Sequence, residues 1–108
     1  NDEAYVEMAM AFAGRILAEP GLANDEQRID FAFRVALTRP PSPVEVAYLN
    51  QLLAKREAAL AAEPKVARQL VSGVKNWRMP AGVEAGDLAK WFAVASVLLN
   101  LDEVITKG

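Results

Sequence analysis

The sequence contains no cysteine and no histidine. The absence of cysteine excludes disulfides, thiolate metal sites and a cysteine nucleophile. The absence of histidine removes the commonest general base and the commonest metal ligand. Ser42 and Ser72 therefore have no histidine to activate them, which excludes serine–histidine hydrolysis within this chain. We expect no cofactor and no metal, and the residues favour a protein that is not an enzyme by itself.

Long apolar runs and phosphate-binding glycine motifs are also missing. No stretch approaches the roughly 20 apolar residues that span a bilayer, so we expect no membrane insertion. No glycine-rich phosphate loop and no signal peptide is visible. The chain begins Asn1-Asp2-Glu3 without an initiator methionine. We interpret residues 1–108 as one helical domain, and the chain as a fragment of a larger protein or a processed chain.

Charge is distributed unevenly along the chain, although the net charge is only −2. Residues 1–30 carry seven acids and two bases, residues 31–78 three acids and eight bases, and residues 79–108 four acids and two bases. The interpretation we favour is that the acidic ends pack beside the basic middle within one domain, and a binding face is the alternative. The balance gives no drive towards nucleic acid.

Apolar residues recur at helical spacing and do not alternate as they would in strands, so the sequence predicts an all-α fold. We expect a single-domain bundle of four to five helices, with a long loop before a last, buried helix. The predicted helices cover residues 2–18, 24–38, 43–62, 64–71 and 87–106.

The helix starts have clear signals. Asn24 is a good N-cap, and Gln27 could complete a capping box with it. The strongest start is Ser42-Pro43, where Glu45 completes a Ser-x-x-Glu box and proline occupies the first helical position. These signals place the second and third helices.

The last helix has almost no polar face in its middle, which predicts that it is the buried spine of the bundle. Phe31 and Val35 widen the apolar arc of the second helix, so we expect that helix to be central too. The loop over residues 72–86 is long for a compact domain, and Trp77 and Met79 are its possible anchors on the core.

Three polar residues near the end of the last helix interrupt its apolar sequence: Asn100, Asp102 and Glu103. One interpretation is a carboxylate site for acid–base chemistry or a divalent cation. The other, which we favour, is that the acids pair with arginines where the helix leaves the core. This predicts that Arg34 or Arg39 lies within ion-pair distance of Asp102 or Glu103.

Trp77 stands between two basic residues, Lys75 and Arg78, in the long loop. Basic and aromatic residues together can form a platform for nucleic acid or sugar. One tryptophan with two bases on an acidic chain favours the other interpretation, a loop anchored by Trp77 with solvated charges beside it.

Three segments carry a family resemblance: residues 1–17, 28–46 and 91–107, with the "AFR-x-AL-x-RPP-S-P-x-E" and "LLNLDE" patterns as the specific parts. The chain resembles the C-terminal part of the planctomycete-specific domain one family, a domain of unknown function. It departs from the family where Thr38 replaces glycine, Ser96 replaces arginine and Val104 replaces phenylalanine. Because a β-branched Thr38 does not easily take a left-handed cap, we expect the second helix to end differently.

The resemblance implies a part of a large exported, periplasmic-like protein that also carries cytochrome-c-like domains. It maps no catalytic residue onto this chain. The leading hypothesis is a structural or protein-interaction module that binds other domains of the parent protein. The alternative is an accessory part of a ligand-binding, glycan-binding or catalytic site completed by other domains, with Arg39, Asn100 and Asp102 at the junction.

Overall fold

The helices predicted from the sequence are present in the computed structural model, which describes the backbone of residues 2–107 and the side chains of residues 2–102. Residues 2–107 contain five helices and no strand, so the all-α prediction is confirmed. The helices are α1 (Glu3–Ala18), α2 (Asp25–Leu37), α3 (Pro43–Ala62), α4 (Pro64–Ser72) and α5 (Ala85–Lys107).

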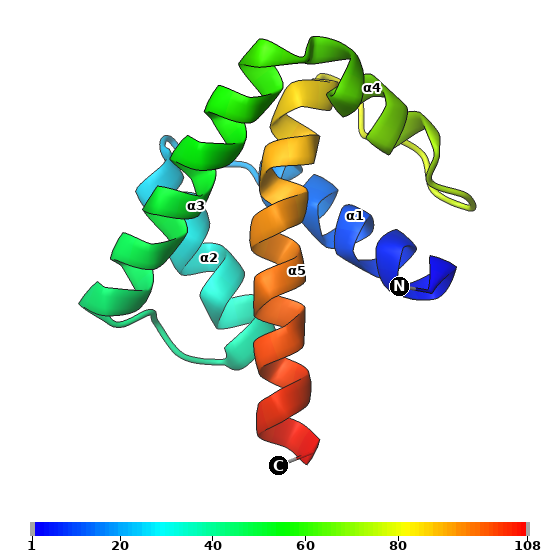
Figure 1. Ribbon diagram of the computed structural model, residues 1–108. Helices are drawn as coiled ribbons and strands as arrows, with labels where there is room; N and C mark the ends of the chain where they lie inside the picture. The colour runs from blue at the N-terminus through cyan, green and yellow to red at the C-terminus, as the bar shows by residue number, and fades with distance from the viewer. Residues whose placement is uncertain (1, 108) are drawn as a thin grey trace.

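Helix α5 is the spine of the fold, as its apolar sequence predicts. It contacts all four other helices, and α1 is its most extensive neighbour. Figure 1 shows α5 running through the middle, with α3 and α1 on either side of it. Trp91, Val94 and Leu98 on α5 are fully or almost fully buried. The alanines between them, Ala93 and Ala95, are buried as well.

Helix α2 is not central, which corrects the sequence prediction. Ile29, Ala32 and Phe33 face the core, but Phe31 and Val35 are only half-buried. The guanidinium carbon of Arg15 lies 5.8 Å from the centre of the Phe31 ring. The extra apolar width of α2 therefore covers surface beside α1 instead of filling the centre, which α5 already occupies.

Local hydrogen bonds fix the helix starts. The Ser42 side chain accepts from the Glu45 N–H while the Glu45 carboxylate accepts from the Ser42 N–H, which is the predicted capping box. Asn24 caps α2 through the Gln27 N–H at 2.9 Å. The Gln27 side chain, however, accepts from the Ala23 N–H one residue further back, so the second predicted box is not formed.

The end of α2 differs from the sequence expectation. Thr38 is the C-cap and adopts the left-handed conformation, with φ 58° and ψ 25°. Its N–H donates to the Arg34 carbonyl at 3.0 Å, and its hydroxyl donates to the Leu37 carbonyl at 2.6 Å. These bonds hold the β-branched residue in a conformation that normally belongs to glycine.

The connection between α4 and α5 is fastened to α1. Trp77 is half-buried and reaches the one buried glycine of α1, Gly14. A Cβ on Gly14 would stand 3.2 Å from Pro80 Cγ and 3.4 Å from Trp77 Cζ2, so the missing side chain makes room for the loop. Trp77 is therefore an anchor, as predicted, whereas Met79 is 42% exposed and is not one.

An ion pair and a hydrogen bond join the acidic start of the chain to its basic middle. Lys75 Nζ lies 3.5 Å from Glu3 Oε1, and Asn76 Nδ2 donates to Glu7 Oε2 at 3.4 Å. Lys90 Nζ lies 3.0 Å from Glu57 Oε1 and links α5 to α3. The contacts of Lys75 with Glu3 and of Asn76 with Glu7 agree with the intramolecular interpretation of the charge pattern, whereas the Lys90–Glu57 pair joins a base of the C-terminal part to an acid of the middle. Both side chains of the Lys75–Glu3 pair are exposed, so that pair contributes little to stability, whereas in the Lys90–Glu57 pair only the Glu57 side chain is exposed.

The strained cap gives a direct test. Replacing Thr38 with glycine relieves about 1–2 kcal/mol of left-handed strain, offset by about 0.4–1 kcal/mol of added freedom in the unfolded chain. We expect Thr38→Gly to raise the free energy of unfolding in urea by about 0.5–1 kcal/mol. Thr38→Val keeps the branched Cβ and should bring no gain. Equal free energies of unfolding for the two variants would contradict the claim that the backbone at Thr38 is strained.

Candidate functional site

The predicted arginines have partners other than the end of α5. Arg34 Nε lies 2.7 Å from Asp30 Oδ2, one turn earlier on α2. Arg39 contacts Glu45 at the start of α3. The sequence predicts that Arg34 or Arg39 lies within ion-pair distance of Asp102 or Glu103. Because the side chain of Glu103 lies outside the described residues, that pairing stays a prediction. Each guanidinium pairs with a carboxylate that is close along the chain, Asp30 for Arg34 and Glu45 for Arg39.

The end of α5 is described only in part. Asn100 is exposed, and Asp102 is half-buried with an interaction of its own. The side chain of Glu103 lies outside the described residues. Leu101, which lies between Asn100 and Asp102 in the sequence, is 38% exposed and lines a groove.

Arg39 and Glu45 form a clasp between the end of α2 and the start of α3. The two guanidinium Nη atoms lie 2.8 Å and 2.9 Å from the two carboxylate oxygens, a bidentate pair. The guanidinium carbon also lies 5.0 Å from the centre of the Phe33 ring. Glu45 thus serves two partners at once, the Ser42 N–H of the capping box and Arg39.

The clasp changes the acidity of Glu45. The hydrogen bonds from Arg39, followed by the bond from the Ser42 N–H, lower the pKa of Glu45 to about 2, although partial burial opposes the shift. A carboxyl group with that pKa stays ionised at neutral pH and cannot act as a general acid there. The arrangement is therefore suited to holding two helices together, not to proton transfer.

Beside the clasp lies an apolar groove between α3 and α5, which we call the α3/α5 groove. Its volume is about 410 Å³. Val44 is 79% exposed, Tyr48 53% and Leu101 38%. The groove is lined by Phe33, Val44, Glu45, Tyr48, Leu49, Val97, Leu98 and Leu101. Among the described residues that line it, Glu45 is the single charged one, and Arg39 already pairs with that charge.

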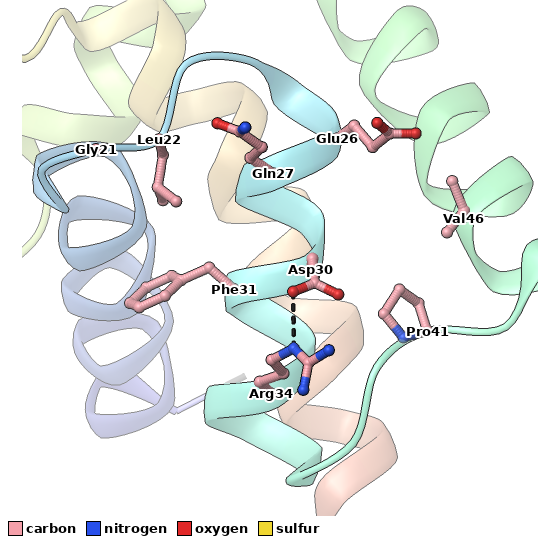
Figure 2. Close-up of a pocket in the computed structure, with 9 residues that line it drawn as sticks. All are labelled: Gly21, Leu22, Glu26, Gln27, Asp30, Phe31, Arg34, Pro41 and Val46. Carbon is pink, nitrogen blue, oxygen red and sulfur yellow. Dashed lines mark hydrogen bonds and ion pairs between the residues drawn. The ribbon is translucent and has the colours of Figure 1, made fainter.

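A wider depression, about 670 Å³, lies over the outer side of α2. Figure 2 shows Asp30 and Arg34 in its middle joined by their ion pair, with Phe31 on one side and Pro41 and Val46 on the other. The central charges already neutralise one another. This depression therefore offers neither an unpaired charge at its centre nor a continuous apolar floor.

A third hollow, which we call the α4 cleft, lies between α4 and the segment that follows it. Its volume is about 480 Å³, and it is lined by Arg68, Val71, Ser72, Val74, Trp77, Arg78, Met79 and Ala85. Sequence reasoning grouped Trp77 with Arg78 but missed Arg68. The sequence gives no signal for that residue, because only the fold of residues 73–84 against α4 brings it to the same cleft.

Among the described residues there is neither a cluster that could hold a metal ion nor a helix that could span a membrane. Within them, no group of three or more acidic side chains comes together in a way that could hold a metal ion. None of the helices, over the part of the chain described, is long and apolar enough to cross a bilayer.

Comparison with protein-family models, with curated proteins and with solved structures finds no match to this chain. The family resemblance drawn from the sequence therefore stays a prediction.

The clasp predicts a specific pH dependence. Because the folded pKa of Glu45 is lowered to about 2, its ionised form stabilises the fold above its unfolded pKa of about 4.3. That contribution is lost as the pH falls from there towards 2. We expect Glu45→Gln to be less stable than the native chain in urea at pH 7, with the difference shrinking below about pH 4.3.

Glu57→Gln is the matched control, because Glu57 is also ion-paired but its side chain is 73% exposed and meets one lysine. Urea unfolding of all three proteins between pH 2 and pH 7 separates the clasp from a general effect of net charge. An equal, pH-matched loss in Glu57→Gln would contradict the role given to the clasp.

Proposed function

We propose that this domain is a protein-interaction module whose α3/α5 groove binds an amphipathic helix from another domain of a larger protein. The observation that carries the proposal is the gathering of exposed apolar side chains at one place. Val44, Tyr48 and Leu101 line the same groove, although large apolar side chains normally avoid water. Because Arg39 pairs with Glu45, the groove residues that the structure describes present no unpaired charge to a ligand.

The spacing of the groove residues suits a helix. Val44 and Tyr48 are four residues apart on α3, and Val97 and Leu101 are four residues apart on α5. Residues at that spacing form a ridge on one side of a helix. Two such ridges with Phe33 between them leave room for the apolar side of a third helix. Helix-in-groove binding uses this arrangement, with anchors at i, i+3, i+4 and i+7 of the bound helix.

The groove is preorganised. Its α3 wall begins one residue after Pro43, at a turn fixed by the capping box and by the Arg39–Glu45 clasp. Its base is Leu49 and Leu98, which are almost fully buried in the core. A binding surface held in place loses little conformational entropy when it binds, so more of the apolar contact appears as affinity.

The family resemblance supports the same proposal from the sequence side. A part of a large exported, multidomain protein has neighbouring domains to bind, and those domains are the partners we propose. The alternative function, an accessory site built on Arg39, Asn100 and Asp102, has less support. Arg39 is already engaged by Glu45, which leaves its guanidinium poorly placed to bind a ligand.

The test uses a fluorescein-labelled, stapled amphipathic helix with leucines at i, i+3, i+4 and i+7 as the probe. We expect saturable binding, weakened at least about tenfold by Val44→Asp or Tyr48→Asp, because each places a charge on an apolar contact. Val44 and Tyr48 are mostly exposed, so both variants should fold. Fluorescence anisotropy measures the affinity, and circular dichroism checks the fold.

Met8→Asp is the matched control, since Met8 is 52% exposed on α1 and does not line the groove. It should bind the probe as the native chain does. Absence of saturable binding, or an equal loss in Met8→Asp, would contradict the proposal. So would a native dimer that Val44→Asp converts to a monomer, because the occupant would then be a second copy.

A further inference from the structure

The α4 cleft lies far from the α3/α5 groove. Ala85, the first residue of α5, lines the cleft, whereas Val97, Leu98 and Leu101 line the groove. At 1.5 Å per helical residue, the two surfaces are separated by about 18 Å or more along α5. Figure 1 shows the same separation, with α4 near the start of α5 and the first turns of α3 near its other end. The cleft and the groove therefore share none of their described lining residues.

Two arginines from different segments line this cleft. Arg68 comes from α4 and Arg78 from the connection, and both are exposed. Within residues 2–102 the structure records ion pairs for several other basic side chains but none for these two. None of the described residues that line the cleft is acidic. Two guanidiniums without a counter-charge beside one hollow are an unmatched positive site.

The rest of the cleft is apolar. Val71 is buried, Val74 and Trp77 are half-buried, and Met79 is 42% exposed. Tryptophan, methionine and arginine are the residue types enriched where proteins bind other chains. The cleft therefore combines apolar contact area with donors for a carboxylate.

The wall of the cleft is held in place by α1. Trp77 packs at Gly14, and the neighbouring Lys75 and Asn76 contact Glu3 and Glu7. Lys75 thus pairs with Glu3 within the chain, whereas Arg78 lines the cleft. Lys75 therefore has a structural role, and Arg78 is available to a ligand.

We propose that the α4 cleft binds an acidic peptide segment in which carboxylates alternate with apolar side chains. The carboxylates pair with Arg68 and Arg78, since a guanidinium binds a carboxylate through two parallel hydrogen bonds. The apolar side chains of the peptide contact Val74, Trp77 and Met79. Nucleic acid fits less well, because binding its phosphates requires a longer row of basic side chains. This cleft has two arginines, and the net charge of the chain is −2.

The probe is a fluorescein-labelled peptide with two aspartates flanked by leucine and phenylalanine, titrated against the whole chain at low salt. We expect saturable binding below about 1 mM, accompanied by a change in the emission of Trp77. The other tryptophan, Trp91, is 1% exposed in the core and gives a constant background. Arg68→Gln and Arg78→Gln should each weaken binding about tenfold, and the same peptide with asparagine for aspartate should bind far more weakly.

Arg56→Gln is the matched control, because Arg56 is an exposed arginine on α3 that does not line the cleft. It makes the same change in net charge and should leave binding unchanged. Thermal unfolding checks that each variant is folded. Three results would overturn the proposal: no saturable binding, equal losses in Arg56→Gln, or tighter binding of a single-stranded oligonucleotide than of the acidic peptide.

Discussion

The apolar circumference of α5 is the constraint on which the fold depends. A helix that is apolar on nearly all sides has to be covered on nearly all sides, and here all four other helices contact it. Trp91, Val94 and Leu98 are removed from water, and each side chain of this kind contributes about 1.5–3 kcal/mol when fully buried. The other helices therefore lie where they cover α5, and this explains why α2, despite its wide apolar arc, stays at the side.

The proposed binding surface follows from the same constraint. Near its last turns α5 extends past the helices that cover it (Figure 1), and Leu101 remains partly exposed there. Val44 and Tyr48, at the start of α3, face the same gap. The apolar surface that builds the core thus continues into a groove that no part of the described chain fills. An interaction module needs such a surface, and the Arg39–Glu45 clasp keeps its wall in position.

Sequence reasoning predicted what is local and missed what depends on distance in space. Prolines and capping residues gave the helix starts, and the composition of α5 gave the spine. Arg39 could not be assigned, because a flexible side chain takes the nearest carboxylate in the fold and Glu45 already had a role as a cap. The left-handed Thr38 was missed because hydrogen bonds to its own helix outweigh the propensity. Arg68 and Arg78 share a cleft only through the return of residues 73–84 along α4.

If α5 is the spine of the fold, it is the last element to lose its structure, and native-state hydrogen exchange measures this directly. We expect the amides of Trp91, Val94 and Leu98 to exchange only through global unfolding, with a free energy equal to that from urea unfolding. Amides of α4, which is short and largely exposed, should exchange at a lower free energy. Exchange of the α5 amides below the global value, while α1 or α3 stays protected, would contradict the central role of this helix.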